Sequence, residues 1–383
     1  MLGSSTLTAK DSSTVYAGTL GNQAVVMAIG TGDDGNLDGR YFYTRHHRDI
    51  PLSGNKGEPD HLQLLEGTDG DDATRPQLDL QRQADGSLVG LWSSTKGKTL
   101  KLVLQPAHVP APAADADPYL KRLYGTDLYE YLRLSDLKLQ QGQRQTFMGY
   151  TLQWWIEPDS KITLFQILDG YPGGQRQRIN QVLHDRLWGE VSSFHECMRG
   201  ANRYGGGDYE QTVTPRLLSA HVVSVSVFTS YDCGGAHPDF GDAPINLDAG
   251  TGLALTLEDV LWLGPGQPFH YAEDTTLEGV ALSNSASSNV SFEVFSGYRE
   301  KSFAPWLAGQ LAALYPSQSK DDGCGYGDAE VWQFPAWYLT PTGIDFTPSF
   351  ARVARVCEAN DDWSVLPYRI VAKHPGKLHL DLP

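Results

Sequence analysis

The sequence predicts an α+β fold: a small N-terminal antiparallel β domain, meander or barrel-like, and a C-terminal antiparallel sheet packed against one or two helices. Short alternating segments separated by Gly, Asp or Asn fill residues 15–105, and no helical period occurs there. A Pro/Ala-rich linker occupies 106–118, and strand-like segments mixed with amphipathic helical patterns follow it. We therefore expect an all-β domain at 1–105, the linker, and an α+β domain at 119–383.

The N-terminal domain is predicted from short segments that alternate apolar and polar residues, as half-buried strands do. They cover 15–20, 24–29, 39–43, 50–54, 62–66, 78–83, 88–93 and 100–104. One connection begins like a calcium loop, with Asp34, Asn36 and Asp38 at the ligand positions. The twelfth position is Arg45, where calcium needs a bidentate glutamate, so a hairpin turn is the better interpretation.

The C-terminal domain is predicted from two strands and two helices. The strands cover 149–156 and 161–169. A helix follows at about 175–200, where apolar residues recur every three or four positions and form one stripe. A second amphipathic helix near 302–315 is expected to pack against the last strands of the sheet.

A hairpin is predicted between His221 and Trp262. Valines alternate with Ser and Thr in its first strand, and Gly-rich turn residues follow. Pro238 and Gly241 predict that the chain stays unpaired until Pro244, before a second strand at 245–248. Next, Thr256 has the position of a helix N-cap, with an aspartate three residues later in the capping-box position.

The search for catalytic chemistry finds no G-x-S-x-G elbow, phosphate loop, dinucleotide fingerprint or C-x-x-C pair. His195 and Glu196 begin a zinc-protease motif, but Arg199 stands where its second histidine is required. One group remains for acid–base or metal chemistry, a histidine among carboxylates; the alternative is that these residues only shape the loop. The group comprises Asp232, His237, Asp239 and Asp242. We predict no enzyme activity, no cofactor and no metal.

The composition favours a basic protein partner. The chain carries 46 acidic against 30 basic residues, a net charge of −16, which repels nucleic acid and anionic lipid. The plain alternative is that these charges only keep the protein soluble. No apolar run is long enough for a membrane span, and the first residues lack a signal peptide's apolar core. We expect the numbering to begin near a removed signal.

Four cysteines predict two disulfides in an oxidising compartment. Three pairings are possible, and proximity in sequence favours Cys197 with Cys233 and Cys324 with Cys357. The alternative is a reduced, buried set in a cytosolic protein. The disulfides lead us to expect a periplasmic or secreted protein.

Two motifs carry a resemblance to a known family. The first joins GGAHP, at Gly234–Pro238, to the pattern N-L-D-x-x-T-G-x-x-L-T-L-E-D-V-L at Asn246–Leu261. The second covers Trp337–Phe346 and the closing Val365–Tyr368. Together they resemble the RsiV-like domain over the C-terminal two thirds of the chain. That domain forms the extracellular part of lysozyme-sensing anti-sigma factors and accompanies peptidoglycan deacetylase domains.

The resemblance implies an exported binding protein of the cell envelope whose partner is a lysozyme-like cell-wall hydrolase. Loops are expected to bind it. The expected recognition loop contains Tyr231, Asp232, Gly234, Gly235, His237 and Asp239, and an acidic rim contains Asp321, Asp322 and Asp328. Two alternatives stay open: a peptidoglycan-binding or cell-wall-modifying module in which Trp332 and Trp337 stack on sugars, and an immunity-type inhibitor of a secreted toxin.

Overall fold

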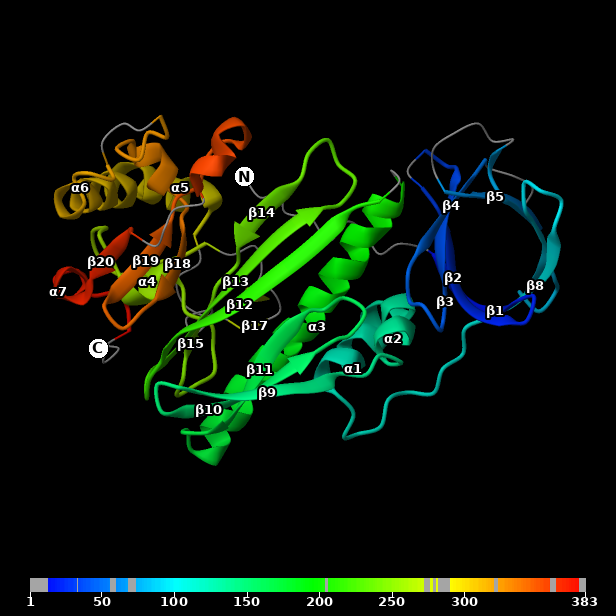
Figure 1. Cartoon of the computed structure of the whole chain (residues 1–383), viewed down its shortest axis with the longest axis horizontal. Helices are drawn as coiled ribbons and strands as arrows, with labels where there is room; N and C mark the ends of the chain where they lie inside the picture. The colour runs from blue at the N-terminus through cyan, green and yellow to red at the C-terminus, as the bar shows by residue number, and fades with distance from the viewer. Residues whose placement is uncertain are drawn as a thin grey trace.

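The computed structural model describes residues 13–32, 34–55, 60–67, 74–203, 206–271, 276–277, 280–281, 290–319, 323–358 and 363–378. The described chain forms three bodies that follow one another along the longest axis (Figure 1). A barrel lies at one end, a long helix with two sheets lies in the middle, and short helices around a small sheet lie at the other end. The fold is α+β, as the sequence predicts.

Antiparallel strands close the N-terminal barrel: each pairs with its neighbour in sequence, and β1 pairs with β8. They are β1 (Thr14–Leu20), β2 (Gln23–Thr31), β3 (Leu37–Tyr43), β4 (Ile50–Gly54), β5 (His61–Glu66), β6 (Gln77–Arg82), β7 (Leu88–Ser93) and β8 (Thr99–Pro106). Successive side chains face opposite sides of a sheet, so one set points inward. Leucines with Tyr16, Met27 and Tyr41 fill the interior. The predicted barrel-like domain is confirmed.

One carboxylate of the barrel is largely buried. Glu66 Oε1 accepts a hydrogen bond from the Tyr41 hydroxyl and another from Trp92 Nε1 at 2.5 Å. Burial raises the pKa of Glu66 above its usual range, and the two hydrogen bonds oppose that rise.

The Asp34 turn is a hairpin connection between β2 and β3, in which the Asn36 N–H donates to Asp34 Oδ1 at 2.9 Å.

Two short helices follow the linker, and the sequence analysis predicted neither. Asp117 caps α1 (Pro118–Thr126) by accepting two backbone N–H groups at 2.8 and 3.2 Å. Proline at the first helical position loses no hydrogen bond there. Asp127 caps α2 (Leu128–Leu134) by accepting a third N–H group at 3.0 Å.

A buried charge cluster joins α2 to the barrel. The side chains of Arg133 and Asp49 are fully buried, and Arg133 Nη2 donates to Asp49 Oδ1 at 2.5 Å. Arg133 Nη1 donates to the His47 carbonyl at 2.9 Å, and the Tyr129 hydroxyl donates to the same Asp49 oxygen at 2.6 Å. Arg40 Nη1 lies 3.6 Å from the other Asp49 oxygen. A buried charge without its partner is costly, so this cluster fixes the barrel against α2.

Helix α3 (Gly173–Arg203) runs through the middle body and packs against both of its sheets. Its buried stripe shares one hydrophobic cluster with both sheets: Ile179, Leu183, Leu187, Val191 and Phe194. One sheet contains β9 (Gln140–Phe147), β10 (Tyr150–Ile156) and β11 (Thr163–Asp169). The other contains β12 (Asp208–Leu218), β13 (Val222–Asp232), β14 (Asp239–Asp242) and β15 (Ile245–Asp248). The predicted helix at 175–200 is confirmed.

One correction concerns the hairpin. The chain was predicted to stay unpaired until Pro244, but β14 pairs with residues 228–231, because β13 extends far enough to offer it a partner.

Beside the charge cluster, His195 of α3 is buried, and its pKa is lowered to about 2 by burial and then by the charge of Arg133. Its Nε2 has no hydrogen-bond partner in the described part of the chain, so His195 is neutral near pH 7.

The C-terminal body packs helices on a sheet. A continuous helix is formed by α5 (Phe292–Tyr298), a π-helical turn η2 (Arg299–Phe303) and α6 (Ala304–Leu314). It covers the predicted helix at 302–315 but begins earlier. The sheet contains β18 (Ala336–Leu339), β19 (Gly343–Thr347) and β20 (Val365–Pro367). Side chains of α6 and this sheet share one core, as predicted.

The remaining short elements of the described chain are α4 (Leu257–Val260), β16 (Thr276–Leu277), β17 (Val280–Ala281), η3 (Ala329–Trp332), η4 (Arg352–Glu358) and α7 (Tyr368–Val371). Helix α4 begins where the sequence predicts, since Asp259 Oδ2 accepts the Thr256 N–H at 2.8 Å. A buried polar pair links the last two bodies: the Ser224 hydroxyl donates to Asn246 Oδ1 at 2.6 Å and accepts the Leu339 N–H at 2.8 Å. No described helix combines the length and low polarity that a membrane span requires.

Candidate binding surface

The predicted recognition loop is the connection between β13 and β14. Its six residues are, in order, Tyr231, Asp232, Gly234, Gly235, His237 and Asp239. Gly234 has a φ of 78°, which glycine adopts at low cost, and its N–H donates to Asp232 Oδ1 at 3.0 Å. The predicted disulfide between Cys197 and Cys233 is confirmed and ties this connection to α3.

The two ends of the loop face each other. Tyr231 pairs with Asp239 across the two strands, and its ring stacks on Tyr209 with centroids 6.3 Å apart. Burial, and then the charge of Asp239, raises the pKa of Tyr231. Asp239 Oδ1 lies 3.1 Å from Arg355 Nε, so this carboxylate forms an ion pair inside the protein.

Arg355 belongs to η4, a short helix that the sequence analysis did not single out. A second η4 arginine, Arg352, donates from Nη2 to the His237 carbonyl at 3.0 Å. The loop is therefore held by η4 on one side and by α3 on the other. Between and beside these arginines, Val353 and Val356 are 99% and 77% exposed. We call the surface formed by the loop and η4 the recognition surface.

Of the predicted acidic rim, Asp328 lies among the described residues and is exposed, whereas Asp321 and Asp322 lie outside them. The predicted disulfide between Cys324 and Cys357 is confirmed and ties η4 to the segment that carries Asp328. The Tyr326 hydroxyl also donates to the Cys357 carbonyl at 2.7 Å.

The carboxylates considered for acid–base chemistry have separate structural partners. Asp239 pairs with Arg355, and Asp232 accepts the Gly234 N–H. Asp242 Oδ2 accepts the Ser226 hydroxyl at 2.7 Å, and its Oδ1 accepts the Val227 N–H at 2.9 Å. These bonds shape the hairpin, which favours the structural interpretation over catalysis.

The aromatic residues considered for sugar stacking differ in exposure. Trp332 is fully buried, and its Nε1 donates to the Tyr326 carbonyl at 2.8 Å. Trp337 is partly buried against the C-terminal core. A sugar stacks on an accessible ring face, so Trp332 is excluded from that role.

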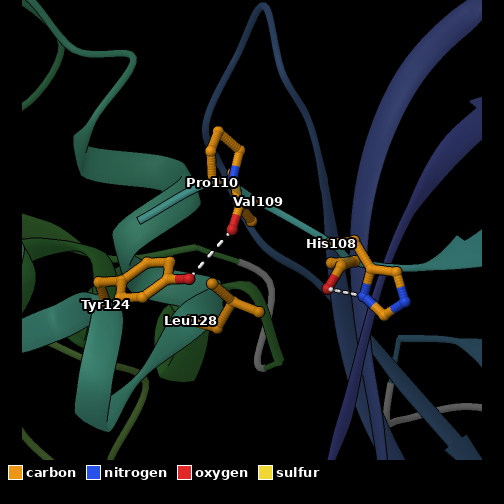
Figure 2. A pocket seen from close by; sticks show the side chains of 6 residues that line it. His108, Val109, Pro110, Tyr124 and Leu128 are labelled. Carbon is orange, nitrogen blue, oxygen red and sulfur yellow. Dashed lines mark hydrogen bonds between the residues drawn. The ribbon is translucent and has the colours of Figure 1, made fainter. Parts of the chain in front are cut away.

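An open cavity of about 540 Å³ lies at the junction of the linker with α1 and α2 (Figure 2). Figure 2 shows Val109 and Pro110 above Tyr124 and Leu128, with His108 to the right and its ring turned away from them. The Tyr124 hydroxyl donates to the Val109 carbonyl at 3.0 Å and so anchors the linker. Among its lining residues, His108 and Tyr124 carry the titratable side chains.

One group of three possible metal ligands occurs within the described ranges. It comprises Asp117, His184 and Asp185, whose ligand atoms all lie within 4.8 Å of one another. The sequence analysis missed it because Asp117 is far from His184 in the chain, and only the docking of α1 on α3 brings them together.

Comparison with models of known protein families gives no match, and comparison with curated proteins gives none either.

Proposed function

We propose that this chain is an exported, non-catalytic binding protein of the cell envelope, and that its recognition surface binds a basic cell-wall hydrolase of the lysozyme type. One observation carries the proposal: Val353 and Val356 are exposed on a helix that is fixed to its surroundings. Arg355 fixes η4 to the loop, and Cys357 fixes it to the segment containing Cys324.

Exposed valines on a fixed element favour a protein partner. Hydrophobic side chains held rigidly at a surface lose little conformational entropy when they bind, so less of the free energy gained by burying them is offset. Aromatic and arginine side chains, which are enriched in the energetic centres of interfaces, lie beside them. The Arg355 guanidinium carbon lies 5.7 Å from the centroid of the Phe240 ring. The Phe228 ring, whose residue is 39% exposed, packs against Phe240 with ring centroids 5.8 Å apart.

Charge favours a basic partner. The net charge of −16 attracts a cationic protein at long range, which speeds encounter and makes the association weaken as salt rises. Two disulfides fit an oxidising compartment, where secreted cell-wall hydrolases act. The resemblance to the RsiV-like domain supplies the specific candidate, a lysozyme.

The test is calorimetric titration of the oxidised protein with a basic c-type lysozyme at two salt concentrations, alongside a bacterial lysis assay. We expect saturable binding that weakens with salt, together with inhibition of lysis. The double variant Val353→Ser and Val356→Ser should bind at least about tenfold more weakly, because two exposed anchors are lost. Val294→Ser is the matched control, since Val294 is also exposed, at 51%, but lies on α5.

Three outcomes would count against the proposal. Absence of binding at both salt concentrations would remove the lysozyme-type partner. Equal weakening by Val294→Ser would remove the recognition surface. Sedimentation of the protein with purified insoluble cell wall, without binding to lysozyme, would replace the proposal by a peptidoglycan-binding module.

A further inference from the structure

A mixed nitrogen and oxygen cluster joins the start of α1 to α3. His184 Nδ1 lies 3.0 Å from Asp117 Oδ2, and the next residue, Asp185, brings its carboxylate into the same group. The side chains of His184, Asp117 and Asp185 are 22%, 20% and 14% exposed. They are therefore fixed by their surroundings and still reachable from solvent.

The donor set is compatible with zinc. Imidazole nitrogen and carboxylate oxygen are both protein ligands of Zn²⁺, and three protein ligands leave a fourth position for water. Ligand atoms bound to a tetrahedral zinc ion are separated by about 3.3 Å. His184 Nδ1 and Asp117 Oδ2 are 3.0 Å apart, and all three ligand atoms lie within 4.8 Å of one another, so a bound ion would draw the Asp185 carboxylate toward the other two groups.

Each carboxylate is oriented by a second contact. Asp117 Oδ1 accepts the two N–H groups that begin α1, which leaves Oδ2 directed at His184. Asp185 Oδ1 accepts Gln181 Nε2 at 2.7 Å. Such outer contacts hold metal ligands in place and raise affinity.

Arg122 is a cation already paired with this group. Its Nη2 donates to Asp185 Oδ2 at 2.8 Å, so a metal ion and the guanidinium compete for the Asp185 carboxylate. The Arg122 side chain is 49% exposed, and an exposed ion pair contributes little free energy. It can therefore be displaced at low cost.

We propose that Asp117, His184 and Asp185 form a Zn²⁺ site that clamps the start of α1 onto α3, with Arg122 as a competing internal cation. Since α1 follows the linker directly, the clamp fixes the point where the linker joins the middle body. The site is independent of the proposed recognition of a hydrolase.

The test is titration of the chelator-treated full chain with Zn²⁺ by calorimetry, and with Co²⁺ by visible absorption, which reports the coordination geometry. We expect one site. His184→Gln and Asp185→Asn should each weaken binding at least about tenfold. Arg122→Ala should instead strengthen it about two- to fivefold, because the competing cation is removed.

The matched control is His108→Gln, which alters an exposed histidine outside the cluster and should leave Zn²⁺ affinity unchanged. Circular dichroism of each variant without metal checks that it folds. Unchanged Zn²⁺ affinity in both His184→Gln and Asp185→Asn would overturn the site. Weaker binding by Arg122→Ala would overturn the competition and show that Arg122 only supports the local structure.

Discussion

Replacing Asp49 by asparagine should destabilise the protein strongly. The substitution keeps the size of the side chain but removes the negative charge between Arg133 and Arg40. Glu130 would then be the remaining partner of Arg133, at 3.3 Å, while Arg40 would keep Glu130 at 3.6 Å and Asp127 at 4.0 Å. Removing one partner of a buried pair costs about 3–5 kcal/mol, a large fraction of the stability of a typical domain.

A second variant separates lost charge balance from lost packing. Asp49→Leu combined with Arg133→Met replaces the pair by apolar groups, and such replacements are often neutral. The Tyr129 hydroxyl would lose its acceptor, which costs about 1–2 kcal/mol. We therefore expect the double variant to lose less than about 2 kcal/mol.

The assay is urea unfolding followed by circular dichroism, with limited proteolysis of the linker as a measure of barrel undocking. Asp49→Asn should unfold at lower urea and be cleaved faster, whereas the double variant should resemble the parent protein. The reasoning would be refuted if Asp49→Asn stayed within about 1 kcal/mol of the parent, or if the double variant were as unstable as the single one.

Two further predictions concern pH. The folded pKa of His195 is lowered to about 2 from an unfolded value of 6.5, so the unfolded state binds the extra proton and stability is lost as pH falls below 6.5. Between pH 6.5 and 5.0 the loss from this residue is about 2 kcal/mol, and His195→Leu should abolish that part of the slope in urea unfolding. Glu66 has a raised folded pKa, so its ionisation opposes folding and stability falls as pH rises from 4.5 through that value. Glu66→Gln keeps an acceptor for Tyr41 and Trp92. The thermal unfolding midpoint of this variant should equal that of the parent protein at pH 4 and exceed it at pH 7. Equal midpoints at both pH values would contradict the argument that burial opposes the ionisation of Glu66.

The barrel was predictable because its signal is local. Each strand alternates over five to nine residues, and its turns contain the residues that turns require, so segments such as 88–93 coincide with β7. Strand β9 shows the limit of this signal. Its sequence, Gln140–Phe147, is largely polar and exposed, and it is a strand only because β10 supplies its partner.

The missed helices have local signals of a weaker kind. Asp117 followed by proline is a helix start, but α1 and α2 are too short to show a periodic stripe. The helix predicted at 302–315 begins at Phe292 in the structure. Its first part was missed because the π-helical turn inserts an extra residue and shifts the apolar stripe. Periodicity therefore detects only the part after the turn.

The recognition surface was half predictable. The loop at 231–239 carries glycines, a histidine and acids, which mark a turn in any sequence. The exposure of Val353 and Val356 depends on how η4 docks, and two valines in a sequence are ordinarily assigned to a core. The Asp49–Arg133 pair was equally hidden, since its members lie on different bodies.

The last turns of α3 place two attachments close together. Cys197 bonds to the recognition loop, and five residues later Asn202 donates to the Asp49 carbonyl of the barrel at 3.0 Å. Five residues of α-helix span only about 7.5 Å. A fragment that starts after the linker would thus remove the neighbour that steadies this helix end and leave Arg133 without Asp49. Fragments for binding studies should retain the barrel, because deleting it would alter the very loop whose affinity is being measured.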